Sequence, residues 1–136
     1  MKHPQPQRIL SIDDLYHILP DNERTMVSHI IELVNMHSVG LTWHMKYNVP
    51  FAYGKKRILF IWPSTIPWGK VPKGKVHVGW CQAHQFPTDV QAYLNFEQRK
   101  QVGVLPFSKP ADIKQSEFLT ILQTAIEVDS DKKKST

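Results

Sequence analysis

The chain has 136 residues, of which 41% are hydrophobic, and a formal net charge of +5. A chain of this length forms one domain and buries about two-thirds of its unfolded surface without metal or disulfide support. Its single cysteine, Cys81, excludes an intramolecular disulfide, and no stretch has the roughly 18 consecutive apolar residues of a membrane span. Because the N-terminus also lacks the apolar run of a signal peptide, we expect a soluble cytoplasmic protein with no membrane partner.

The N-terminal part of the chain predicts two helices. Residues 1–10 are polar and contain two prolines, so we expect them to form a flexible lead-in. Ser11 opens an S-x-x-D signal for the start of a helix, which Pro20 ends. We expect Asp21 to cap a second helix, in which apolar residues recur at helical spacing. Gly40 is suited to end that helix and to turn the chain into the first strand.

The middle of the chain predicts a central hairpin. In residues 41–49 apolar and polar side chains alternate, as in a half-buried strand, which places Trp43 and Tyr47 on the same face. The continuous apolar run 58–62 predicts a second, buried strand, and Pro50 with the segment 53–56 between the two predicts a longer loop. Only one face of the first strand can pack on the core, so the face left open is where we expect the function.

Two further strands are predicted after this hairpin. Residues 63–75 are rich in proline and have no sustained period, which is typical of a loop. Apolar residues alternate in 76–80, which predicts a third strand, and the composition of 99–105 predicts a final one. Residues 82–98 fit either a short helix or an irregular cover, and the pattern does not decide between them.

The C-terminal part predicts one helix and a tail. Asp112 and Gln115 have the spacing of an N-cap and its partner, and the apolar face of the helix ends near Val128. Residues 129–136 have the composition of a disordered tail. We therefore expect residues 11–128 to form a single α+β domain, in which an antiparallel sheet of about four to five strands is flanked by two N-terminal helices and one C-terminal helix.

These elements and their sequences resemble the YdhG-like family, a bacterial domain of unknown function. The resemblance rests on WHMKYNVPFAYGKKRILFIW, HVGW and RKQVGVLPFSKPADIKQSEFLTILQTAIEV, and it covers nearly the whole chain. It implies an α+β fold in the bacterial cytoplasm, without agreed catalytic residues. Some members are described as frataxin-like iron chaperones, so the resemblance implies iron as a candidate cofactor. Frataxin-like iron binding uses an acidic surface, whereas the predicted sheet of this chain is basic.

Charge is distributed unevenly along the chain. Residues 11–39 contain five acidic residues and one arginine, a net charge of −4, whereas residues 41–100 contain nine basic and two acidic residues, a net charge of +7. A basic sheet region favours an anionic ligand or nucleic acid. The alternative is that these cations only keep the turns and sheet edges soluble.

His77, Cys81 and His84 have the residue types of a metal site. On an extended strand, however, about 13 Å separates His77 from Cys81, so the alternative is an exposed histidine followed by a buried cysteine. A catalytic Cys81 nucleophile assisted by His84 or His44 is a further alternative, but the sequence offers neither the third residue of a catalytic triad nor a glycine-rich nucleophile elbow. Since the sequence also has no phosphate-binding glycine motif, we favour a protein that is not an enzyme.

Aromatic residues and an arginine provide the candidate binding site. Trp43, Tyr47 and Trp62, together with Arg99, would line a cleft between the sheet and its helices if one sheet face were partly open. Aromatic rings beside cations suit a planar or anionic ligand, and the alternative is that the rings are core residues. We therefore predict a small binding protein for a small ligand or a protein partner. Metal handling and weak nucleic-acid binding through the basic loops remain as alternative functions.

Overall fold

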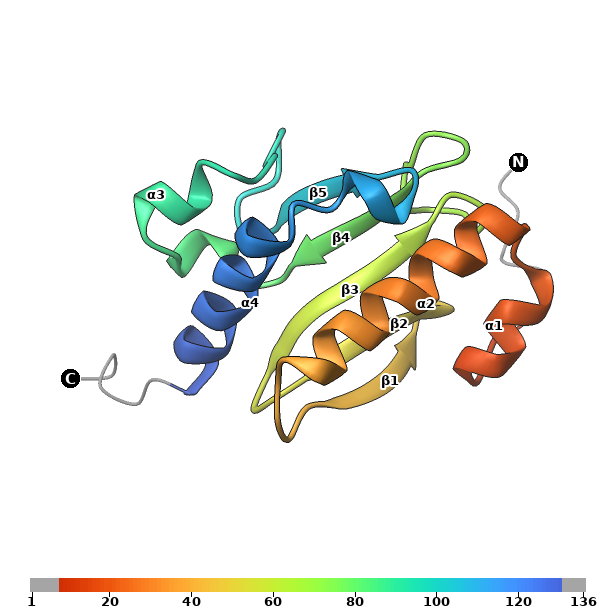
Figure 1. The fold of residues 1–136 in the computed structure, drawn as a ribbon, viewed down its shortest axis with the longest axis horizontal. Helices are drawn as coiled ribbons and strands as arrows, with labels where there is room; N and C mark the ends of the chain where they lie inside the picture. The colour runs from red at the N-terminus through yellow and green to blue at the C-terminus, as the bar shows by residue number, and fades with distance from the viewer. Residues whose placement is uncertain (1–7, 131–136) are drawn as a thin grey trace.

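The computed structural model describes residues 8–130, so most of the predicted lead-in and tail lie outside the described residues. Figure 1 shows its α-helices and strands, which are α1 (Ile12–Ile18), α2 (Asp21–Met36), β1 (Thr42–Lys46), β2 (Val49–Tyr53), β3 (Arg57–Pro63), β4 (Val76–Trp80), α3 (Thr88–Gln91), β5 (Gly103–Phe107) and α4 (Gln115–Ser130). Two 3-10 turns occur at Ala83–Gln85 and Pro110–Asp112. Among the helices of this range, none combines the length and apolar character needed to span a membrane.

The strands form a single antiparallel sheet in the order β1, β2, β3, β4, β5. Each strand pairs with the next one along the chain, so the sheet is a meander with β1 and β5 at its edges. Both α2 and α4 lie across one face of this sheet (Figure 1). The predicted α+β fold, with an antiparallel sheet, two N-terminal helices and one C-terminal helix, is therefore confirmed.

The core lies between the sheet and these two helices. The ring of Trp80 in β4 is fully buried there and meets Phe118 of α4, with the ring centroids 5.5 Å apart. At the β1 edge, Trp43 Nε1 donates a hydrogen bond of 2.9 Å to Asn35 Oδ1 of α2. The second helix contributes a fully buried stripe at helical spacing, formed by Met26, Val27, Ile30 and Val34.

The indole N–H of Trp80 is buried without a hydrogen-bond partner among the described residues. An unpaired buried donor costs about 1–3 kcal/mol. A tryptophan ring buries roughly 150–250 Å², which stabilises the fold by about 4–6 kcal/mol at 25 cal/mol per Å². Burial of the ring therefore outweighs the unpaired donor, and Trp80 remains a core residue.

The starts of the first two helices lie close to their sequence signals. The Ser11 hydroxyl oxygen accepts a hydrogen bond of 3.0 Å from the backbone N–H of Asp14, so the predicted start of α1 is confirmed. In α2 the cap is Pro20, and Asp21 is the first helical residue rather than the predicted cap. The Asp21 carboxylate instead forms an ion pair of 2.9 Å with Arg24 one turn later.

The start of α4 differs from the prediction. The helix begins at Gln115, whereas we expected Asp112 to cap it. The Asp112 carboxylate accepts hydrogen bonds from the backbone N–H groups of Ser108 and Lys109, at 2.8 and 3.1 Å, and these bonds lower its pKa. Asp112 therefore closes the 3-10 turn that precedes the helix, which explains a capping signal at this position.

The end of α4 is fixed to the sheet. The Asp129 carboxylate accepts hydrogen bonds from the backbone N–H groups of Lys55 and Lys56, at 2.7 and 2.8 Å. These two donors lie in the turn between β2 and β3, and the helix continues to Ser130. Asp129 therefore belongs to the folded domain, and its prediction as part of the tail is wrong.

The largest difference from the prediction is a turn at Tyr47 and Asn48. Both residues have a positive φ, 54° and 68°, which is the combination that a two-residue type I′ hairpin turn requires. The predicted strand over residues 41–49 is therefore two strands, since β1 ends at Lys46 and β2 begins directly after the turn. Pro50 and Tyr53, which we expected in the loop of the hairpin, consequently lie in β2.

The later strands agree with the prediction in part. The bounds of β4 coincide with the predicted strand 76–80. The last strand, β5, starts at Gly103, later than the predicted start at residue 99, and the preceding loop meets it through an isolated bridge between Asn95 and Val104. Pro106 lies within β5. An edge strand tolerates proline because the backbone groups on its outer side do not pair with another strand, so no hydrogen-bond donor is needed there. The segment 82–98, which we left undecided, contains the first 3-10 turn and α3.

Candidate functional site

The sheet has a second face, which points away from α2 and α4, and we call it the open face. Side chains alternate between the two faces, and β3 shows the difference in burial: Leu59 and Ile61 are fully buried, whereas Phe60 and Trp62 are half-buried. Strand register places further residues beside these two rings. The open face includes His44, Lys46, Phe51, Tyr53, Arg57, Phe60, Trp62, His77 and Gly79.

Four aromatic rings form a closed set of contacts on the open face. Tyr47 lies nearly parallel to Trp62, with an interplanar angle of 23° and ring centroids 6.5 Å apart. Trp62 meets Phe60 edge-on at 5.9 Å, Phe60 meets Phe51 at 5.3 Å, and Phe51 meets Tyr47 at 6.1 Å. We call these four residues the aromatic platform. Tyr47 is 57% exposed and Phe51 only 4%, so the platform offers solvent its Tyr47, Phe60 and Trp62 rings.

Two glycines hold the rings of the platform in place. The Phe60 ring lies over Gly79 of β4, where a Cβ atom would overlap the ring. The Trp62 ring lies against Gly69 of the following loop in the same way, and its Nε1 donates a hydrogen bond of 2.9 Å to the Ile66 carbonyl oxygen. These contacts fix the orientation of both rings before any ligand binds, which lowers the entropy lost on binding.

Arg57 lies at the end of the platform nearest the turn between β2 and β3. Its guanidinium carbon is 5.4 Å from the centroid of the Phe51 ring, within the range of a cation–π contact. Its Nε donates a hydrogen bond of 3.2 Å to the Tyr53 hydroxyl, which raises the pKa of the guanidinium. The His44 ring meets the Tyr53 ring edge-on, with the ring centroids 5.0 Å apart. The guanidinium is therefore held beside the rings with most of its surface in solvent.

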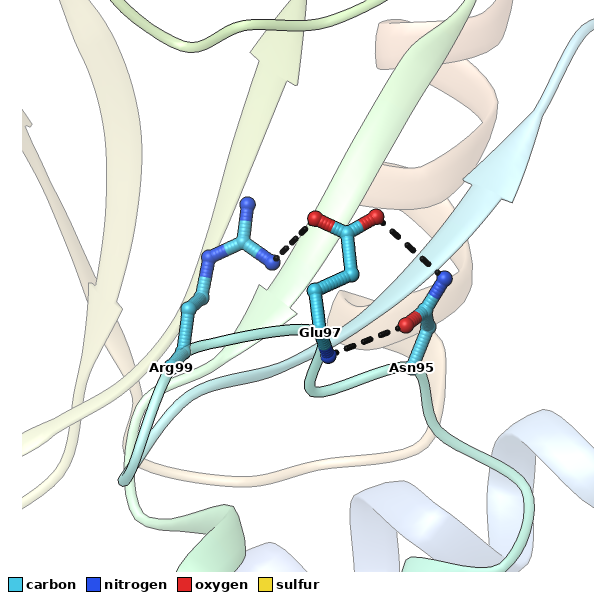
Figure 2. Close-up of polar contacts among 3 residues, drawn as sticks. All are labelled: Asn95, Glu97 and Arg99. Carbon is cyan, nitrogen blue, oxygen red and sulfur yellow. Dashed lines mark hydrogen bonds and ion pairs between the residues drawn. The ribbon is translucent and has the colours of Figure 1, made fainter.

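A loop between α3 and β5 provides charge on the opposite side of the open face. Figure 2 shows the Glu97 carboxylate between the Asn95 amide and the Arg99 guanidinium, with α2 on the far side of the strands. The Asn95 side-chain oxygen accepts a hydrogen bond of 3.1 Å from the Glu97 backbone N–H, and Arg99 Nη1 lies 3.5 Å from Glu97 Oε1. Glu97 has a positive φ of 51°, which this local hydrogen bond supports.

This loop acts electrostatically on His77 in β4. Burial lowers the pKa of the His77 imidazole, the positive charges of Arg99 and Lys75 lower it further, and Glu97 opposes them. Arg99 and Glu97 therefore lie close enough to the open face to influence its side chains. Lys46 and Arg57 lie on the open face as well, so three cations are found on or beside it.

The structure brings together three of the four predicted binding residues. Tyr47 and Trp62 belong to the aromatic platform, and Arg99 lies on the loop beside it. Trp43 lies on the other face, where it is hydrogen-bonded to α2, so it does not share a site with the other three. The alternation placed Trp43 and Tyr47 together only because the turn after Lys46 was not recognised.

Three residues of the site were missing from the prediction. Phe51 and Arg57 lie beside the residues that suggested a loop, and Phe60 falls in a run that suggested burial on both faces. The period-two relation between Phe60 and Trp62 would have identified Phe60 as a neighbour of Trp62 on one face.

Of the three candidate metal ligands, His77 lies near the start of β4, Cys81 directly follows the strand, and His84 lies in the 3-10 turn after it. Among residues 8–130, no group of three or more His, Cys, Asp or Glu side chains is arranged to hold a metal ion. Burial raises the pKa of the Cys81 thiol to about 12, and nearby Arg57 only partly opposes this effect. A thiol that stays protonated at neutral pH is a poor nucleophile and a poor metal ligand. We therefore assign no reactive role to Cys81.

A hollow of about 440 Å³ lies between the first turn of α2 and the loop that follows β3. Its one buried charged residue is Glu23, which is 3% exposed. The Glu23 carboxylate accepts hydrogen bonds from the Ser64 hydroxyl at 2.6 Å and from the Thr65 N–H at 3.0 Å. Glu23 is therefore committed to joining α2 to the loop, and we interpret this hollow as structural.

Comparison of the chain with protein-family models finds no match, and comparison with curated proteins and with solved structures finds no significant match. The YdhG-like resemblance and the iron that it implies therefore stay predictions. Function has to be inferred from the residues of the open face, where rings and cations lie next to one another.

Proposed function

We propose that this protein is a non-enzymatic binding module that takes a planar, negatively charged ligand on the open face of its sheet. The observation that supports the proposal most strongly is the aromatic platform, in which partly exposed rings are held in fixed orientations beside cations. Soluble domains normally bury rings of this size, so a group of them at the surface marks a surface for a ligand.

Stacking on the platform would supply much of the binding energy. A planar group that stacks on an aromatic side chain gains about 1–3 kcal/mol. Tyr47 and Trp62 are the rings best placed for this contact, because Tyr47 is well exposed and Trp62 is held by Ile66 and Gly69. Their nearly parallel planes favour a ligand with a flat ring system over a branched aliphatic one.

The surrounding cations would select for negative charge. Lys46, Arg57 and Arg99 all lie on or beside the open face, and hydrogen bonds from such groups to an anion are stronger than those between neutral groups. Glu97 is the acidic residue of the nearby loop, and its carboxylate is directed to Arg99. A ligand phosphate or carboxylate would take over that contact with Arg99.

Flavin mononucleotide is a suitable probe because it is planar, carries a phosphate and loses fluorescence when it stacks on tryptophan. We expect the protein to quench flavin fluorescence saturably. Replacement of Tyr47 by Asn should weaken binding about tenfold, because one stacking contact is lost. Asn tolerates the positive φ of this turn, so the hairpin should remain intact.

The matched control is Tyr93→Asn, which removes a tyrosine that is 44% exposed and makes none of the platform's ring contacts. This variant should bind flavin mononucleotide as the wild type does. Riboflavin, which lacks the phosphate, should bind more weakly than flavin mononucleotide to both proteins. Absence of saturable binding, or equal loss in the two tyrosine variants, would contradict the proposal.

A further inference from the structure

We infer that the ligand of the aromatic platform is a single-stranded nucleic acid, of which a few nucleotides cross the open face. This inference rests on the proposed function, and it adds that the planar anion is one unit of a polymer. The arrangement of the cations and the rings over the sheet supports it, as does the charge of the two faces.

The cations are spread around the platform instead of converging on one point. Arg57 begins β3 and Trp62 lies five residues further along the same strand, a distance of about 16 Å at 3.3 Å per residue. Across the sheet, Lys46 pairs with Val49 in β2, and Trp62 of β3 pairs with His77 in β4. The sheet therefore has three interstrand spacings between β1 and β4, which correspond to about 14 Å across the strands at 4.8 Å per spacing.

A compact ligand is normally bound in a concave site by a few polar groups that converge on it. On this open face, Lys46 lies at the β1 edge, Arg57 at the turn before β3, and Arg99 on the loop beside β4 and β5. A compact ligand that stacks on the rings would meet only part of this spread of charge. A chain of phosphates that crosses the strands would meet all three cations, while its bases lie on the rings between.

The platform suits unpaired bases in particular. Each base has a flat face that stacks on an aromatic ring whatever its sequence, and sheet surfaces with exposed aromatic residues bind two or three bases in this way. In a duplex the bases are already stacked on one another and cannot lie on Tyr47 or Trp62. An acidic protein segment could meet the cations, but it has no planar groups to place on the rings.

Charge also distinguishes the two faces of the molecule. The segment that contains α1 and α2 has a net charge of −4, whereas the cations Lys46, Arg57 and Arg99 lie on or beside the open face. Because α2 covers the face opposite the platform (Figure 1), a polyanion is repelled from the helical side and attracted to the open face. This asymmetry would orient a nucleic acid strand before it makes contact with the rings.

The test uses the wild-type chain and a fluorescein-labelled oligothymidylate of about ten nucleotides, with binding followed by fluorescence anisotropy. Three phosphate contacts at about 0.7 each predict a slope of about −2 for log K against log salt concentration. Binding should therefore weaken about 20-fold when the salt concentration rises fourfold.

Two variants separate stacking from charge. Tyr47→Asn should weaken binding at least fivefold and leave the salt slope unchanged, because it removes a ring without removing a charge. Arg57→Gln should reduce the magnitude of the slope by about 0.7. Tyr93→Asn and Lys114→Gln, which change exposed residues that make none of the platform's ring contacts, are the matched controls and should leave affinity and slope as in the wild type.

Several outcomes would overturn the inference. Equal binding to polyglutamate would show that charge alone is recognised, and tighter binding to a DNA duplex would show that unpaired bases are not the ligand. Oligonucleotide binding that is indifferent to Tyr47→Asn would exclude stacking on the platform. If flavin mononucleotide binds in a Tyr47-dependent way while the oligonucleotide does not, this inference fails and the proposed function stands. If neither probe binds, both fail.

Discussion

The platform depends on Gly79, which leaves room for the Phe60 ring, and the variant Gly79→Ala tests that packing. The added Cβ would overlap the ring, and overpacking of this kind costs about 1–3 kcal/mol. Gly79 does not have a positive φ, so alanine is otherwise acceptable there and should stabilise the strand by about 0.5–1 kcal/mol relative to glycine. We therefore expect a net loss of about 1–2 kcal/mol in the free energy of unfolding.

Removal of the ring should reverse the sign of this effect. In a Phe60→Ala background the clash is absent, so Gly79→Ala should stabilise the protein by about 0.5–1 kcal/mol. The double-mutant cycle then gives a coupling energy of about 2 kcal/mol between the two positions. Urea unfolding of the four proteins, followed by the fluorescence of the buried tryptophan, measures each free energy.

The control for this cycle is Gly74→Ala. Gly74 has a positive φ of 84°, and nothing lies within 4 Å of the position its Cβ would take. Its replacement should cost about 1–2 kcal/mol through backbone strain alone, equally with and without the Phe60 ring. If Gly79→Ala changes the free energy of unfolding by the same amount with and without the Phe60 ring, that ring does not lie over Gly79. The described platform would then be wrong.

Three further results are expected. Burial and Arg99 lower the pKa of the His77 imidazole from 6.5, so the unfolded chain binds a proton there more readily than the folded protein does. The free energy of unfolding should therefore fall as the pH drops below about 6.5, and His77→Gln should weaken this dependence in urea unfolding. An identical pH profile for the wild type and the variant would contradict this prediction. Because the Cys81 pKa is about 12, iodoacetamide should label the native protein at pH 8 far more slowly than the unfolded chain, and equal rates would contradict its burial. Glu23→Ala leaves Ser64 and Thr65 without their buried acceptor and should cost about 3 kcal/mol in the free energy of unfolding, whereas a loss below about 1 kcal/mol would show that this network is dispensable.

Local signals predicted where α1, α2 and α4 occur and the bounds of the simplest strand, but not every helix end. The hydroxyl of Ser11 caps α1 as its spacing indicated, and β4 has the predicted bounds. These features depend on neighbouring residues only, such as a capping side chain or a short alternation. Their prediction therefore required no knowledge of what lies on the other side of the sheet.

The hairpin between β1 and β2 shows why the site itself was only partly predictable. Tyr47 is a good strand residue that continues the alternation, so the pattern hid a turn that only Asn48 suggested. Pro50 then suggested a loop, although it lies in β2. The register between β2 and β3 begins at Phe51, so the missing N–H of Pro50 is not needed for that pairing.

Assignment of the open face required the tertiary structure. Phe60, Trp62 and Ile61 lie in one apolar run, and only the packing of α2 and α4 determines which of them are covered. Trp43 and Trp62 are similar residues on neighbouring parts of the sheet, yet one is bonded to Asn35 of α2 and the other belongs to the platform. Composition alone cannot separate a core ring from a binding ring.

The central claim is that ligand binds to the open face, and the indole N–H signals of the tryptophans test it directly. In proton–nitrogen correlation spectra, titration with the oligothymidylate or with flavin mononucleotide should shift the Trp62 signal, since its ring belongs to the platform. The signals of Trp43 and Trp80 should stay in place, because both rings lie on the face that α2 and α4 cover. Shifts of Trp43 or Trp80 without a shift of Trp62 would place the ligand elsewhere and contradict the account.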